Sequence, residues 1–344
     1  MNWKMTAATA ALAIFGFAGG ASAEGALNIY NWGDYTSPEL IKKFEQKFDV
    51  KVTVTDYDAN DTALAKVRAG GHGFDIVVPS SNYVPIWVKE GLLLEARPDQ
   101  MENFKNVDPR WVDVAWDKGR HYTVPWQWGL TGIGLNKKVY SGDINTSAIF
   151  LDPPKEVIGK INVTPEMNDV LFATIKYLGG DWCTADKELL KKVRDTLVAA
   201  KPKWLAMDYS VTEKLPSGDY SAVYYWNGAV MRARLKNPDI VFGYPKEGFP
   251  FFMDSVAILK DAKNPENAKK FMNFIMEPEN AALISAFAKY ANGIKGSEAF
   301  MPADMKNAPE LVVPAQFEKA GEFLTTCPPD VSELYTRIWT DVNK

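Results

Sequence analysis

The stretch Phe74-Asp75-Ile76-Val77-Val78, followed by Pro79-Ser80-Ser81, is an almost wholly apolar run of strand length. A strand without polar alternation is typical of a parallel sheet, because helices cover both faces of such a sheet. The run therefore predicts an α/β fold. In open α/β sheets, ligands bind beyond the carboxyl ends of the strands, so the loop that begins at Ser80 is a candidate binding loop.

The segment before this run alternates strands with helices. Residues 27–30 alternate apolar and polar side chains and predict a strand, which the loop Trp32-Gly33-Asp34-Tyr35 follows. Ser37 before Pro38 is a typical helix start. A second strand over 52–54 and a short helix over 62–69 complete the pattern. Strands that alternate with helices indicate a parallel sheet.

The rest of the chain continues this alternation. We expect a strand over 131–135 that crosses between lobes and further strands over 221–226, 241–244 and 255–259. Helices are expected over 168–178 and from residue 265 onward. No internal repeat or low-complexity linker divides the 344 residues. Two lobes joined by crossing strands fit this pattern, with candidate binding loops at Trp32, Ser80 and Trp126.

The N-terminus has the pattern of a secretory signal peptide over residues 1–23. Lys4 is followed by an apolar and small-residue stretch at 6–17, and Ala21-Ser22-Ala23 fits the small-x-small cleavage rule. The alternative is a buried N-terminal helix. The signal peptide predicts export to the periplasm, cleavage near Ala23 and a mature chain that begins at Glu24.

The chain has two cysteines, Cys183 and Cys327. In an oxidising compartment they could form one disulfide, and two buried thiols are the alternative. Their spacing does not fit a zinc site or CxxC redox chemistry.

Several function classes lack their usual sequence signals. The two histidines, His72 and His121, stand in polar, Gly-containing turns, which argues against a metal or catalytic role. No GxSxG, P-loop, GxGxxG or HExxH motif occurs, so we expect no cofactor and no catalytic site. The net charge of -4 comes from interspersed charges, which gives no indication of nucleic-acid binding.

Aromatic residues and acids gather at predicted loops and strand ends. Aromatic faces attract ammonium groups and pack against methylene chains, and a buried carboxylate binds an ammonium through a charge-assisted hydrogen bond. Together they predict a slot for an alkylamine, although core packing is the alternative for any single aromatic. The aromatics are Trp32, Tyr35, Trp126, Trp128, Tyr224, Tyr225, Trp226, Phe249, Phe251, Phe252 and Tyr290.

Five motifs together resemble the spermidine/putrescine-binding proteins of ABC importers. They are Asn31-Trp32-Gly33-Asp34-Tyr35, Phe74-Asp75-Ile76-Val77-Val78-Pro79-Ser80, Thr131-Gly132-Ile133-Gly134-Leu135-Asn136, Tyr225-Trp226-Asn227-Gly228 and Met253-Asp254-Ser255-Val256-Ala257-Ile258. The resemblance implies a two-lobed periplasmic binding protein fold, type II-like, in which each lobe is a mixed, mainly parallel sheet flanked by helices. It places residues 24–133 plus 256–300 in lobe 1 and residues 134–255 plus 301–344 in lobe 2.

The resemblance also implies a ligand site in the cleft between the lobes. By position, aromatic rings would stack on the methylene chain, Asp254 would be the main acid for an ammonium, and Glu166 and Asp169 align with family carboxylates. For these two acids, a solvated position in the first turn of a helix is the alternative. The full set is Trp32, Tyr35, Ser80, Glu166, Asp169, Trp226, Phe252, Asp254 and Tyr290.

Three positions depart from the family pattern: Gly33 replaces Ser or Thr, Asn82 replaces an aromatic, and Ala229 stands where putrescine-type members have a second aspartate. The ligand could be spermidine-like, or a zwitterionic amine such as γ-aminobutyrate or an opine. Arg232 or Arg234 could meet a carboxylate in that case, although we expect both to face solvent.

The implied partners are a small-molecule amine and an ABC permease in the inner membrane, and we expect a monomer. The alternative from another class is a secreted enzyme on the same scaffold.

Overall fold

The structure is a computed structural model that describes residues 25–344. The predicted signal peptide and Glu24 lie outside these residues. The strands are β1 (Gly25–Trp32), β2 (Val50–Tyr57), β3 (Ile76–Val77), β4 (Asp113–Val114), β5 (Asp117–Lys118), β6 (Thr123–Asn136), β7 (Ile161–Val163), β8 (Ala222–Trp226), β9 (Ile240–Gly243), β10 (Phe249–Ile258) and β11 (Gly321–Phe323).

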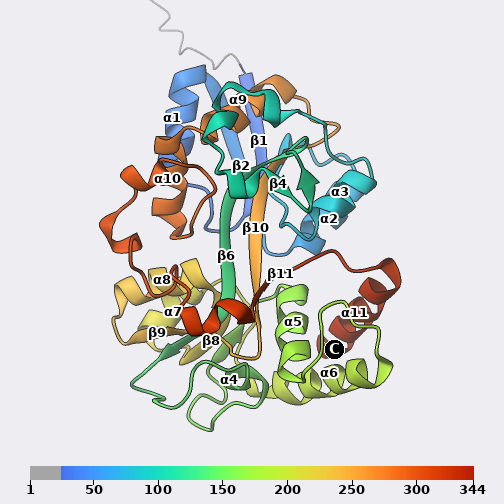
Figure 1. Cartoon of the computed structure of the whole chain (residues 1–344), viewed down its shortest axis with the longest axis vertical. Coiled ribbons are helices and arrows are strands. Elements are labelled where there is room, and N and C mark those ends of the chain that lie inside the picture. The colour runs from blue at the N-terminus through green and yellow to red at the C-terminus, as the bar shows by residue number, and fades with distance from the viewer. Residues whose placement is uncertain (1–24) are drawn as a thin grey trace, which may run out of the picture.

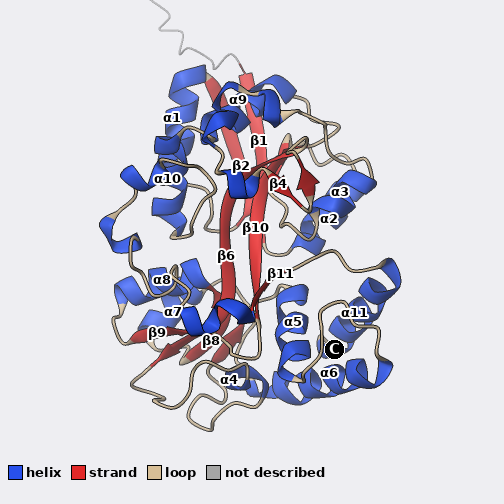
Figure 2. Ribbon diagram, in the orientation of Figure 1, coloured by secondary structure: helices blue, strands red, loops and turns tan. Residues whose placement is uncertain are grey.

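Helices flank these strands in both halves of the molecule, as Figure 2 shows. They are α1 (Pro38–Phe48), α2 (Asn60–Arg68), α3 (Val84–Lys89), α4 (Ala148–Leu151), α5 (Met167–Tyr177), α6 (Lys187–Ala200), α7 (Val211–Ser217), α8 (Asn227–Lys236), α9 (Pro265–Ile275), α10 (Pro278–Ala288) and α11 (Pro329–Val342). None of the helices in residues 25–344 combines the length and hydrophobicity needed to cross a bilayer.

The main sheet is mixed and runs through the whole molecule in the order β2-β1-β3-β10-β6-β8-β7, with β11 beside β10 and β9 beside β6. Strands β1, β2 and β3 are parallel, as are β7 and β8. The long strands β6 and β10 pair antiparallel and extend through both halves (Figure 1).

Two lobes follow from the packing of the side chains. The core of the first lobe comes from residues 27–126 and 253–294, and the cores of the second come from residues 130–249 and 331–342. Strand β6 changes core between Trp126 and Leu130, and β10 changes core between Phe249 and Met253. The chain therefore passes between the lobes within continuous strands. The lobe boundaries at 133 and 256 stay predictions.

The first predicted helix is confirmed in detail, because the Ser37 side chain caps α1 by accepting a hydrogen bond from the Leu40 N–H. The binding loop expected at Trp126 is wrong, since Trp126 and Trp128 lie inside β6. The strand expected from residue 255 starts at Phe249. Prolines at positions 125 and 250 mimic strand ends in the sequence. Pro125 is accommodated in β6 because the pairing register shifts opposite it, between Asp254 and Ser255.

Cys183 and Cys327 form a disulfide, so the alternative of two free thiols is excluded. The bond joins the segment after α5 to the segment before α11 and links residues 144 positions apart. Trp182 supports this junction by donating a hydrogen bond from Nε1 to the carbonyl of Thr325, at 3.0 Å. The C-terminal segment is thereby fixed to the second lobe.

Candidate ligand-binding site

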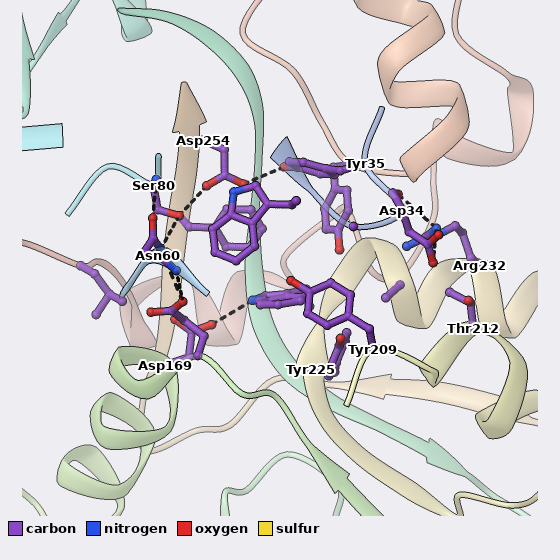
Figure 3. Close-up of a pocket in the computed structure, with 18 of the residues that line it drawn as sticks. Asp34, Tyr35, Asn60, Ser80, Asp169, Tyr209, Thr212, Tyr225, Arg232 and Asp254 are labelled. Atoms are coloured by element: carbon purple, nitrogen blue, oxygen red, sulfur yellow. Dashed lines mark hydrogen bonds and ion pairs between the residues drawn. The ribbon is translucent and has the colours of Figure 1, made fainter. Parts of the chain in front are cut away.

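A pocket lies between the two lobes, where β6 and β10 pass from one to the other (Figure 3). Its empty space, counting the part open to solvent, is about 660 Å³. All nine residues predicted from the sequence line it. They are Trp32, Tyr35, Ser80, Glu166, Asp169, Trp226, Phe252, Asp254 and Tyr290.

Asp254 of β10 is the acid that the first lobe contributes. Ser80, at the carboxyl end of β3, donates a hydrogen bond from Oγ to Asp254 Oδ1 at 2.6 Å, and Tyr35 donates from Oη to Oδ2 at 2.9 Å. Burial raises the pKa of Asp254 to about 7, although these two hydrogen bonds oppose the shift. The carboxyl is thus held in place by two hydroxyl donors.

Glu166 and Asp169, at the start of α5, are the acids of the second lobe, and they are only 5% and 4% exposed. Solvated first-turn positions are therefore excluded for both. Thr131 and Trp226 donate to Asp169 Oδ2 at 2.5 and 3.0 Å, and burial raises the pKa of Asp169 to about 6. Burial, with a smaller contribution from the charge of Asp169, raises the pKa of Glu166 well above its usual value. We call Glu166, Asp169 and Asp254 the acid cluster.

Asn60, the first residue of α2, connects the acids of the two lobes, and the sequence reasoning missed it. Its backbone and side-chain N–H groups donate to Glu166 Oε2 at 3.2 and 3.4 Å. Its side chain also donates to Ser80 Oγ at 3.1 Å, and Ser80 in turn donates to Asp254. The position of Asn60 just before the helix expected over 62–69, beyond the end of a strand, was the available signal.

The aromatic residues form the walls of the pocket. Trp32 is oriented by a hydrogen bond from Nε1 to the carbonyl of Val78, at 2.9 Å. Its ring centre lies 5.8 Å from that of Trp226, at a steep angle of 74°. Tyr290 packs closely on Gly228, where an added Cβ would lie 2.6 Å from the ring. The backbone at Gly228, in the Trp226-Asn227-Gly228 motif, thus fixes one wall. Trp126, by contrast, belongs to the core of the first lobe.

The other end of the pocket contains Arg232 and Asp34, and Tyr225 lies on the wall between them and the acid cluster (Figure 3). The expectation that Arg232 faces solvent is wrong, because its side chain is 19% exposed and lines the pocket. It forms an ion pair with Asp34, whose Oδ2 lies 3.8 Å from Arg232 Nη1. Arg234 also does not face solvent freely, since it pairs with the fully buried Glu310 at 2.5 Å.

Contacts between the lobes surround the pocket. Asn168 donates from Nδ2 to Tyr83 Oη at 3.3 Å, and Tyr209 donates from Oη to the carbonyl of Asp58 at 3.3 Å. Thr326 donates from Oγ1 to the carbonyl of Asn82 at 2.5 Å. The lobes are therefore in contact around the acid cluster and the aromatic walls.

The three positions that depart from the family pattern all line this pocket. A Cβ at Gly33 would lie 3.5 Å from the Tyr209 ring, which is an ordinary contact distance. The Tyr209 ring therefore lies beside the position that a Ser or Thr side chain would take at residue 33. Ala229 is buried and supplies no carboxylate. The wall near Arg232 thus has fewer acids than the opposite end of the pocket.

Comparison with known proteins supports a transport role. The model of the bacterial extracellular solute-binding protein family matches residues 39–313. The spermidine/putrescine-binding periplasmic protein of Salmonella typhimurium is 30% identical, with 92% of this chain and 91% of the relative covered. The putrescine-binding periplasmic protein PotF of Escherichia coli is 29% identical, with 92% and 90% covered. The solved structure of the Tp0655 (TpPotD) lipoprotein of Treponema pallidum has a TM-score of 0.79 and 26% identity, with 92% and 99% covered.

Proposed function

This chain belongs to the bacterial extracellular solute-binding protein family, and we propose that it captures a polyamine between its lobes for an ABC importer. The relatives named for spermidine and putrescine support this ligand class. They also support a periplasmic location and delivery of the ligand to a permease in the inner membrane. Capture and release involve no chemical step in this proposal.

The observation that carries the proposal is the acid cluster. Three carboxyl groups are buried within one pocket, and burial raises the pKa of each. Among the residues that line the pocket, Arg232 is the one basic side chain, and it pairs with Asp34 at the far end. An ammonium group would bring positive charge next to these carboxylates and would replace the water that otherwise hydrates them.

The aromatic walls suit the rest of a polyamine. Trp32, Trp226 and Phe252 line the pocket together with Tyr290. Rings at these positions can pack against methylene groups, and they attract a cation to their faces. A chain that alternates ammonium groups with short methylene stretches meets both requirements.

The proposed mechanism is closure of the two lobes, between which the chain passes from Trp126 to Leu130 in β6 and from Phe249 to Met253 in β10. A ligand that contacts Asp254 on one lobe and Asp169 on the other favours the closed state, because it binds that state better than the open one. Asn60 already connects Ser80 of the first lobe to Glu166 of the second in the structure. The closed surface would then be recognised by the permease.

A thermal-shift titration of the mature protein tests the proposal. Putrescine and spermidine should stabilise the folded state by about 2.7 kcal/mol at a hundredfold excess over the dissociation constant. Butane-1,4-diol is the matched control, since it has the chain length of putrescine but no charge, and it should give no shift. A protein that responds to no polyamine, or equally to the diol, would refute the proposed function.

A further inference from the structure

Two buried hydrogen-bonding atoms of the pocket have no partner within the described residues: Tyr225 Oη and Arg232 Nε. Both side chains line the pocket, and Tyr225 is 1% exposed. Buried polar atoms are nearly always hydrogen-bonded in folded proteins, because an unmade bond costs the desolvation of the group. We call Tyr225 and Arg232 the donor end of the pocket.

Both groups can donate a hydrogen bond. Burial raises the pKa of the Tyr225 phenol well above its ordinary value, while the nearby Arg232 guanidinium opposes this shift. The phenol therefore keeps its proton at neutral pH. Arg232 uses Nη1 for Asp34, at 3.4 Å from its carbonyl and 3.8 Å from Oδ2, and this leaves Nε unused. Asp34 itself has a side chain that is 52% exposed.

Arg232 of the donor end lies opposite the acid cluster. Figure 3 shows Asp254 and Asp169 on one side of the pocket and Arg232 on the other, with Tyr225 on the wall between them. The acid cluster has no adjacent basic side chain among the lining residues, whereas the donor end carries a guanidinium. An ammonium group placed there would face a like charge, and a ligand oxygen would accept hydrogen bonds from both donors.

We propose that the donor end binds an oxygen atom of the ligand, so that the preferred ligand is a polyamine acylated at one end. The free ammonium groups lie at the acid cluster, and the carbonyl oxygen accepts hydrogen bonds from Tyr225 Oη and Arg232 Nε. This inference rests on the proposed function and narrows its ligand class. A carboxylate offers the same acceptor chemistry, but it would add a negative charge to a pocket whose lining already carries four carboxyl groups and one guanidinium.

Calorimetric titration with ligands that differ at one end tests the inference. Putrescine, N-acetylputrescine and 4-aminobutyrate share a four-carbon spacing, and spermidine with its N-acetyl derivatives extends the series. N-Acetylputrescine or an N-acetylspermidine should bind about tenfold or more tightly than its parent amine. Tightest binding of 4-aminobutyrate would overturn the inference, because the preferred ligand would then be a zwitterion and not an acylated polyamine.

Two other results overturn the inference. If putrescine or spermidine binds more tightly than every oxygen-bearing analogue, the inference is wrong and the proposed function stands. If no amine binds, the proposed function fails and the inference fails with it.

Variants of the donor end provide an independent test. Tyr225→Phe and Arg232→Gln should each weaken the best oxygen-bearing ligand about 10-fold to 100-fold, and should change putrescine affinity by less than about threefold. Tyr177→Phe and Arg337→Gln, which lie outside the pocket, are the matched controls. Thermal unfolding establishes that each variant is folded. Equal weakening of both ligands by both variants would mean that these residues act only in lobe closure.

Discussion

Replacement of Asp254 by asparagine should lower ligand affinity and at the same time stabilise the ligand-free protein. Asparagine keeps the shape of the side chain, and its amide can accept a hydrogen bond from one of the hydroxyls of Ser80 and Tyr35 and donate to the other. The change therefore removes the charge and little else. Loss of one partner of a buried charge pair costs about 2–5 kcal/mol, or about 30-fold to several thousandfold in the dissociation constant.

The stability effect has the opposite sign. Burial raises the pKa of Asp254 from 3.8 to about 7, which corresponds to about 4 kcal/mol of unfavourable free energy once the group is ionised. Because the folded pKa lies above the unfolded value, this group lowers stability as the pH rises from about 4 to about 7. Asp254→Asn should thus raise the free energy of unfolding by up to about 4 kcal/mol at pH 8 and by about half of that or less at pH 5.

Urea unfolding at both pH values measures the stability, and calorimetric titration measures the affinity. Asp113→Asn is the matched control, because Asp113 is exposed and lies outside the pocket. Unchanged affinity in Asp254→Asn would show that Asp254 does not bind the ammonium group. A ligand-free variant that is less stable than wild type at pH 8 would show that the Asp254 carboxylate is not a buried, uncompensated charge.

Three further predictions concern the disulfide, the pocket wall and the acid cluster. The double variant Cys183→Ser with Cys327→Ser should lower the free energy of unfolding in urea by about 2–5 kcal/mol, while a polyamine should still raise its melting temperature. An unchanged urea midpoint would show that the disulfide adds no stability. Gly228→Ala should weaken binding by about 1–3 kcal/mol because its Cβ would overlap the Tyr290 ring, and undiminished affinity would show that this wall adapts. Affinity should fall as the pH drops below 7, by up to about tenfold per pH unit for each carboxyl of the acid cluster that must lose its proton to bind an ammonium. Calorimetry in buffers of different ionisation enthalpy should detect the released protons, and a flat affinity profile between pH 5 and pH 8 would contradict this.

The fold could be predicted from the sequence wherever a local pattern matched the local structure. Ser37 before Pro38 predicted a helix start, and the cap hydrogen bond is present. The long strand β10 was predicted only in part, because Pro250 breaks the pattern that normally indicates a continuous strand. Neither periodicity nor propensity could show that this strand belongs to both lobes, since that depends on pairing with β6 and β11, which are distant in sequence.

The same distinction between local patterns and contacts distant in sequence applies to the residues of the candidate site. Residues such as Trp32 and Asp254 were found because they lie in motifs that resemble a known family, and the structure places them in one pocket. Asn60 was missed and Arg232 was expected to face solvent, because their positions depend on partners from the other lobe, Glu166 and Asp34. Whether a side chain on an amphipathic helix faces solvent or a cleft is decided by the element that packs opposite it, and one segment does not contain that information.

The position of the acid cluster explains why the cavity is suited to binding rather than to holding the lobes together. In the proposed closure, Asp169 approaches Asp254, and the charge of Asp169 adds to the burial that raises the pKa of Asp254. Closure is therefore opposed by the same groups that a cation would satisfy. A ligand that supplies positive charge between them removes this opposition, and its charge gives it a higher affinity for the closed state than for the open one. An apolar pocket of the same shape could close without a ligand, and it would then give a permease no means of distinguishing a loaded protein from an empty one.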